Sequence, residues 1–260
     1  MPALCGFSAP VYKPAMQPEL QHVIDKCYAA FASYPPPRVL DASPARDAAA
    51  ILATLTSAPL RELSGERLGS YGGWAMTTVG DVNDYKHFLP RILELALGDQ
   101  GRHGLDPPII AGKLNYGGWQ GWPPEEQSPV SALFAAAWRH GLEQHPDELD
   151  PGGWLSGIAI IGGDLDAALA AWLASPSPNA TLQLAKFFHG DAEQLVKEKA
   201  NRGFWDNAGD AAIETMRRWL LSEPVMDRLL FAAGTVAPQD EWRIDHALLV
   251  LDALTPANSR

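Results

Sequence analysis

Apolar residues recur along this chain at intervals close to the 3.6-residue period of an α-helix. The first stripe consists of Leu20, Ile24, Cys27 and Phe31, and similar stripes follow almost to the C-terminus. They predict roughly ten to twelve helices, most of them about 10–18 residues long, and no convincing strand. We therefore expect an all-α fold, an irregular array of short helices stacked as αα-hairpins.

Two dipeptides mark where these helices should begin. Helical patterns follow Ser-Pro at residues 43–44, 128–129 and 177–178, and Gly-Asp at residues 80–81, 163–164, 190–191 and 209–210. Gly-Asp at residues 98–99 is followed instead by a longer loop rich in glycine and proline. A serine caps a helix and a proline fits its first position, whereas a glycine ends one helix and an aspartate caps the next. The dipeptides therefore predict short connections between consecutive helices.

Prolines and glycines indicate where the pattern is interrupted. The run Pro35–Pro37 predicts a rigid, extended joint between the first two helices, and Pro90 should kink or split the helix around it. Gly-Gly-Trp occurs at residues 72–74, 117–119 and 152–154, but the spacings differ and indicate no regular repeat. We expect one helical domain over residues 1–260, with a weak possible subdivision near residues 98–108.

Composition supports the helical prediction and narrows the function. Ala and Leu together number 71 in the 260 residues, against 20 for Val and Ile, which favours helices over strands. The net charge of −11 argues against binding to nucleic acids and to anionic membranes. Cys5 and Cys27 lack Cys-x-x-Cys spacing, and we expect Cys27 to be a buried thiol. With no signal-peptide pattern and no apolar run of about 18 residues, we expect a cytoplasmic protein.

Three segments carry a family resemblance. Residues 75–95 read AMTTVGDVNDYKHFLPRILEL, residues 34–41 read YPPPRVLD, and residues 122–126 read WPPEE. The chain resembles a family of uncharacterised bacterial all-helical proteins, most sharply over residues 34–41 and 71–95. The resemblance implies a helical fold and a bacterial source, and it brings no activity to transfer. Some relatives have a cysteine cluster directly after the Leu-Asp pair, whereas residues 42–45 of this chain read ASPA.

Common nucleophile, nucleotide and metal motifs are absent from the sequence. There is no Gly-x-Ser-x-Gly elbow, no phosphate loop and no Gly-x-Gly-x-x-Gly after a strand. His140 and His145 are five residues apart, about 140° around a helix, so they do not share a face. Residues 147–150 are acidic but lack the alternating ligands of a calcium loop. We therefore expect no metal site and no cofactor.

The densest polar stretch covers residues 81–91. Asp84, His87 and Arg91 are three and four residues apart, so all three can share one helix face. A histidine between a carboxylate and a guanidinium could act as a general acid or base, or bind an anion. The alternative interpretation is structural, with Asp84 near the positive start of the helix and Arg91 paired to a neighbour.

A second candidate site is aromatic. Tyr116, Trp119 and Trp122 lie among glycines that would leave aromatic faces uncovered. Such a surface could bind an apolar ligand, a sugar or a helix of a partner protein. In the alternative interpretation, tryptophans fill wide gaps between irregularly crossing helices, and glycines permit the close approach.

These patterns favour a non-catalytic helical module for protein interaction or scaffolding in the bacterial cytoplasm. The alternative is an enzyme or a small-ligand-binding protein with a site near His87, Arg91 and the stretch Tyr116–Trp122. A protein partner is expected, and nucleic acids and membranes are not. The sequence predicts neither the identity of the partner nor the oligomeric state.

Overall fold

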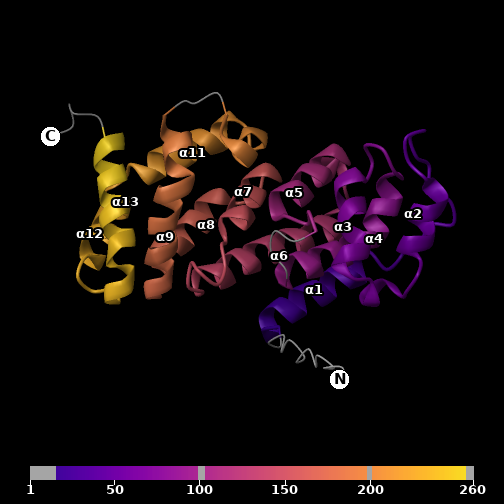
Figure 1. Cartoon of the computed structure of the whole chain (residues 1–260), viewed down its shortest axis with the longest axis horizontal. Coiled ribbons are helices and arrows are strands. Elements are labelled where there is room, and N and C mark those ends of the chain that lie inside the picture. The colour runs from indigo at the N-terminus through magenta and orange to yellow at the C-terminus, as the bar shows by residue number, and fades with distance from the viewer. Residues whose placement is uncertain (1–15, 99–102, 198–200, 256–260) are drawn as a thin grey trace, which may run out of the picture.

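A computed structural model describes residues 16–98, 103–197 and 201–255, and within these ranges the chain is all-α (Figure 1). Its only β-type pairings there are isolated bridges of Val79 with Ala42 and with Ala75. The helices are α1 (Pro18–Ala30), α2 (Ala48–Leu55), α3 (Gly65–Trp74), α4 (Val82–Gly98), α5 (Pro107–Tyr116), α6 (Pro124–Leu142), α7 (Gly152–Ile160), α8 (Leu165–Ala174), α9 (Pro178–Gly190), α10 (Ala192–Val196), α11 (Asp210–Leu220), α12 (Glu223–Ala232) and α13 (Glu241–Leu254). The predicted fold class is confirmed.

The helices are arranged in an elongated array, with α2 near one end and α12 and α13 at the other (Figure 1). The long helix α6 lies in the middle and packs against α1, α7, α8 and α9. The other main contacts join α5 to α7 and α9 to α13. Buried apolar side chains form one contiguous cluster from Ile24 in α1 to Leu254 in α13. The interpretation of residues 1–260 as a single domain stays a prediction.

The helix-start signals were partly right. Ser177 caps α9 by accepting a hydrogen bond from Asn179, and Asp164 caps α8 in the same way. Ser43 does not start a helix, because its backbone N–H bonds to the carbonyl of Thr78 and so belongs to the bridged segment. Ser128 lies inside α6, which already begins at Pro124.

Helix α4 runs unbroken through Pro90, so the predicted split does not occur. Helix α7 has no counterpart among the predicted stripes, because seven of its nine residues are buried and it lacks a polar face. The three Gly-Gly-Trp tripeptides occupy different places: the end of α3, the turn after α5 and the start of α7. Their unequal spacing therefore has a structural reason, and no repeat underlies it.

Tryptophans fill the gaps between these short helices, as one interpretation of the sequence predicted. Trp138 and Trp172 are almost wholly buried, and their rings meet edge to face with centroids 4.9 Å apart. Each indole N–H is satisfied by a backbone carbonyl, that of Ala168 for Trp138 and that of Ala180 for Trp172.

None of the helices described is long and apolar enough to cross a membrane.

A buried ion pair joins α4 to α6. The ammonium of Lys86 lies 2.6 Å from a carboxylate oxygen of Glu126, and both side chains are more than nine-tenths buried. Lys86 also donates a hydrogen bond to the Tyr34 hydroxyl, which in turn donates to Glu126. The ammonium lies 4.2 Å from the centre of a Trp122 ring. Burial lowers the pKa of Lys86, but the bonds to Glu126 and Tyr34 outweigh it, so the net shift is upward and the charge is kept.

This network fixes the start of the tri-proline joint, residues 35–37. Tyr34 directly precedes Pro35–Pro37, and its hydroxyl is fixed between Lys86 and Glu126. Its backbone carbonyl accepts a further hydrogen bond from Nδ1 of His87. Since a proline run is stiff, fixing the residue before it also fixes the path of the chain beyond it.

Removing one partner of the pair should be costly. We expect Lys86→Met to lower the free energy of unfolding by about 3–5 kcal/mol, because it leaves the Glu126 carboxylate buried without a counter-ion. The double variant Lys86→Met with Glu126→Leu should recover most of that loss, since neither charge then remains. Urea unfolding followed by circular dichroism measures both. Equal stability of the single and the double variant would show that the charges are not coupled.

Candidate functional site

A groove of about 560 Å³ lies between the tri-proline joint and the turn that follows α2. Its walls are mostly apolar: Pro36, Pro37, Leu55, Pro59, Leu60 and Leu63. Prolines on both sides make the walls stiff, because their backbone φ angles are fixed. The ionisable groups among its lining residues are Arg38 and His87. Within an acidic protein, this groove therefore carries basic groups and no carboxylate.

His87 is the one predicted site residue that lines the groove. Its Nδ1 lies 2.9 Å from the carbonyl oxygen of Tyr34, and a carbonyl can only accept, so Nδ1 carries a proton. The other ring nitrogen, Nε2, makes no hydrogen bond within the described part of the chain. The ring also meets Phe88 edge to face, with centroids 4.7 Å apart. These contacts fix the ring and leave Nε2 as the nitrogen with which a ligand could bond.

Asp84 and Arg91 are engaged elsewhere. The Asp84 carboxylate accepts from the backbone N–H of Asp81, and the Asp81 side chain accepts from that of Asp84, which is a reciprocal cap at the start of α4. Burial, together with the charge of Asp81, raises the pKa of Asp84. Arg91 donates to the carbonyl of Leu63 and pairs with Glu94 at 2.6 Å. Asp84, His87 and Arg91 form no hydrogen bond with one another among the residues described, and a joint acid–base role for them stays a prediction.

The aromatic candidate site is mostly buried. Trp119 and Trp122 are 3% and 7% exposed, and their indole N–H groups donate to the backbone carbonyls of Ile161 and Gly117. Tyr116, at the end of α5, is 63% exposed. The two tryptophans therefore act as packing groups, and Tyr116 is the member of the trio that a ligand could reach. A binding role for these residues stays a prediction.

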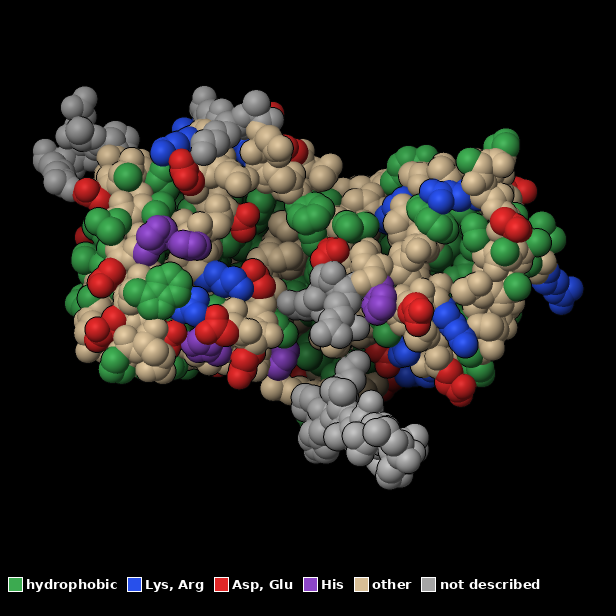
Figure 2. Space-filling model, viewed as in Figure 1, with side chains coloured by type: hydrophobic (Ala, Val, Ile, Leu, Met, Phe, Trp, Pro, Cys, Tyr) green, Lys and Arg blue, Asp and Glu red, His purple; other side chains and the backbone are tan. Residues whose placement is uncertain are grey.

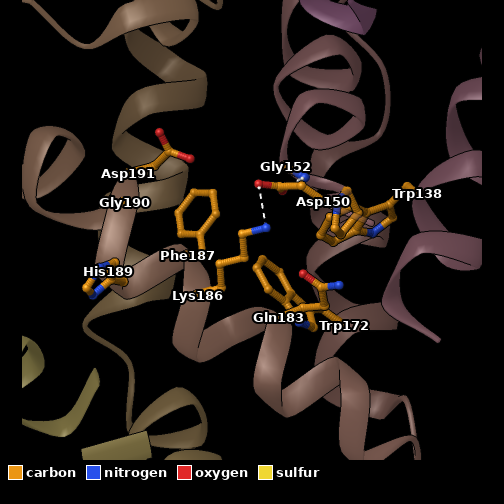
Figure 3. A pocket seen from close by; sticks show the side chains of 11 residues that line it. Trp138, Asp150, Gly152, Trp172, Gln183, Lys186, Phe187, His189, Gly190 and Asp191 are labelled. Atoms are coloured by element: carbon orange, nitrogen blue, oxygen red, sulfur yellow. Dashed lines mark hydrogen bonds and ion pairs between the residues drawn. The ribbon is translucent and has the colours of Figure 1, made fainter. Parts of the chain in front are cut away.

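The structure contains a second site that the sequence did not indicate. A cavity of about 150 Å³ lies between the end of α9 and the start of α7 (Figure 3). Its lining combines two carboxylates and an ammonium with buried aromatic rings: Asp150, Asp191, Lys186, Phe187, Trp138 and Trp172. Charged groups on a small, partly enclosed cavity are a common mark of a binding site.

The two carboxylates of this cavity have different surroundings. Asp150 pairs with Lys186 at 3.2 Å and accepts from the backbone N–H of Gly152. Lys186 also donates to the carbonyl of Pro146. The Asp191 carboxylate has no hydrogen-bond donor among the described residues. Burial, and then the charge of Asp150, raises the pKa of Asp191 to about 6.

The position of Asp191 explains why sequence patterns missed it. Gly-Asp at residues 190–191 predicts an aspartate that caps a helix, as Asp164 does in α8. Asp191 stands at the cap of α10, but its side chain makes no capping bond and is directed toward Gly152 and Asp150 (Figure 3). The residues near its carboxylate, Asp150 and Gly152, lie about forty positions earlier in the chain, at the start of α7. No local spacing in the sequence indicates this contact.

Metal ligands do not gather in the described part of the chain, where no group of three or more His, Cys, Asp or Glu residues could hold an ion. Histidines meet in pairs at most: His189 and His246 lie with Nδ1 atoms 3.0 Å apart, and Figure 2 shows histidines side by side over α9 and α13. Burial raises the pKa of the Cys27 thiol to about 12, as befits the buried thiol that the sequence predicted. Cys5 lies outside the described residues.

Comparison with known proteins adds no assignment. No family model, no curated protein and no solved structure matches the chain. The function must therefore be argued from the groove and the cavity themselves.

Asp191 should make the stability of the protein depend on pH. Its pKa is raised from 3.8 to about 6 in the fold, so protonation of Asp191 stabilises the folded state below pH 4, and this contribution is lost as the pH rises through 6. Asp191→Asn should therefore raise the free energy of unfolding at pH 8 by about 1–3 kcal/mol, and by less at pH 5. Urea unfolding at both pH values measures the difference.

Asp227→Asn is the matched control, because Asp227 is an exposed aspartate in the middle of α12. The control should leave stability nearly unchanged at either pH. A destabilising effect of Asp191→Asn at pH 8 would show that Asp191 is stabilised by a partner in the free protein.

Proposed function

We propose that the chain is a helical protein-interaction module that binds an apolar segment of a partner protein in the groove beside His87. The observation that supports this most is the groove itself, with its volume of about 560 Å³ and its stiff, apolar walls. Such a surface excludes water from apolar side chains at little cost in ordering, since prolines on both walls are already rigid.

The ionisable groups of the groove favour a partner that carries a negative charge. Arg38 is exposed at the groove and supplies the positive charge, whereas a neutral His87 with its proton on Nδ1 presents Nε2 as an acceptor for an N–H or O–H group of the partner. The protein as a whole carries a net charge of −11, which repels acidic chains elsewhere on its surface. A segment with apolar residues and one acidic side chain therefore fits this groove better than a basic segment does.

Binding is favoured over catalysis by what the other polar groups of the groove do. The hydroxyls of Thr56 and Ser57 line it, but they donate to the backbone carbonyls of Leu52 and Thr54. Neither hydroxyl bonds to His87, so no nucleophile is paired with a base there. The alternative, an enzyme or small-ligand protein around His87 and Arg91, would need a reacting group that the groove lining does not supply.

Blocking the groove should abolish partner binding. Ala58 lines the groove, and we expect Ala58→Trp to fill it. Ala253 is exposed on α13, outside the groove, so Ala253→Trp is a matched control of equal bulk. Each protein is used as bait in an extract of the source organism, and the partner identified is then purified and its Kd measured by calorimetry.

The expected result is a partner that binds the wild type and Ala253→Trp equally, and binds Ala58→Trp at least tenfold more weakly. Arg38→Glu should also weaken binding about tenfold, and more so at low ionic strength, because it replaces an attraction by a repulsion. A purified partner whose Kd is the same for all four proteins would place the interaction on another surface. Turnover of a substrate that His87→Ala abolishes would favour the enzyme.

A further inference from the structure

We propose that the cavity between α7 and α9 is a binding site for a guanidinium group, held between the carboxylates of Asp150 and Asp191. This site is separate from the groove beside His87 and does not depend on the function proposed for that groove.

The two carboxylates flank Gly152, the first residue of α7. A Cβ atom built on Gly152 would lie 3.1 Å from Oδ1 of Asp150 and 3.8 Å from Oδ2 of Asp191. The two oxygen atoms are therefore within about 7 Å of each other, with only a glycine beside the space between them. Figure 3 shows Asp191 on one side of this space and Asp150 with Gly152 on the other.

A guanidinium has the right dimensions for this space. It is planar and presents N–H groups in opposite directions, so one ion can donate to two carboxylates on either side. An N–H···O bond is about 2.9 Å long, so a guanidinium beside Gly152 can reach two carboxylate oxygens that are no more than about 7 Å apart. The cavity volume of about 150 Å³ suits a head group of a few heavy atoms, since an apolar cavity of about this size holds benzene.

The charges around the cavity favour a cation. Asp150, Asp191 and Lys186 line it, so the carboxylates outnumber the ammonium. Lys186 is held by Asp150 at 3.2 Å and by the carbonyl of Pro146, and it forms no ion pair with Asp191 among the described residues. A cation placed beside Asp191 would supply the charge and the hydrogen-bond donors that this carboxylate does not find among the described residues.

The walls favour a guanidinium over an ammonium or a divalent metal ion. Phe187 lines the cavity with its aromatic ring, on which a flat, weakly hydrated guanidinium can stack. A divalent ion would need further ligands, and among the described residues no three acidic, histidine or cysteine side chains are placed to hold an ion together. An ammonium is a compact, strongly hydrated charge that would gain less from the rings.

The test is a titration with methylguanidinium, in parallel with methylurea, which has nearly the same shape but no charge. Isothermal titration calorimetry at pH 8 should give one site with a Kd of about 0.1–5 mM for methylguanidinium and no heat for methylurea. The indole N–H signals of Trp138 and Trp172, which line the cavity, should shift in NMR spectra. Equal binding of the two probes would overturn the proposal.

Two variants and one control locate the site. Asp191→Asn removes one carboxylate charge, and Gly152→Ala places a methyl group between the two carboxylates without changing any charge. Each should weaken methylguanidinium at least tenfold, whereas the exposed Asp227→Asn should leave the Kd unchanged. Unchanged binding in both cavity variants would overturn the proposal, even if one of them alters stability.

The pH dependence of methylguanidinium binding offers a second check on the site. Lowering the pH from 8 to 5 should weaken methylguanidinium several-fold, because Asp191 gains a proton near pH 6. The other ionisable groups that line the cavity are Asp150, Lys186 and His189. The remaining affinity of Asp191→Asn for methylguanidinium should change far less between pH 8 and pH 5. An equal loss of affinity in the variant would mean that another of these groups governs it.

The guanidinium could belong to a free metabolite or to an arginine side chain of a protein. A blocked peptide, acetyl-Gly-Arg-Gly-amide, is therefore titrated beside methylguanidinium and agmatine. Tighter binding of the peptide than of either small cation indicates an arginine of a protein, and the reverse order indicates a small molecule. Failure of all three cations to bind the wild type would overturn the proposal, whatever happens at the groove beside His87.

Discussion

A lysine ammonium cannot remain charged inside a protein unless its hydrogen bonds and its charge are both satisfied there. Lys86 meets this requirement with one carboxylate, one hydroxyl and two aromatic rings, and all of these groups lie far from Lys86 in sequence. Glu126 belongs to α6, Tyr34 to the joint after α1, and Trp122 to the turn before α6. Much of the N-terminal half is therefore arranged around one charge.

The shape of the groove beside His87 depends on the position of Tyr34 in that arrangement. Tyr34 is held by its hydroxyl and by its backbone carbonyl, so the prolines that follow it start from a fixed point. His87 is the residue next to Lys86 in α4, and the same helix turn thus supplies the buried charge and the half-buried imidazole. A change at Lys86 should consequently alter ligand binding at the groove without touching its lining.

Sequence patterns predicted those features that depend on neighbours along the chain. The apolar stripes, the cap at Ser177 and the cap at Asp164 each involve residues within a few positions, and the structure confirms them. Features that depend on distant partners were missed. The polar stretch 81–91 gives no sign that Lys86 is buried, because Glu126 and Tyr34 lie 40 and 52 positions away. The partner of His87 is a backbone carbonyl, which no side-chain pattern records, and Asp191 faces a cavity made by another helix.

Helix α7 has a consequence for the motions of the whole array. Two glycines begin it, apolar side chains cover it on all sides, and it packs against α5, α6 and α8. With so little helix preference of its own, it depends on these neighbours for its shape. Its backbone amide protons should therefore exchange with deuterated water only when the array around it opens, at a rate set by global unfolding. α7 would then report on the cooperativity between the two ends of the molecule.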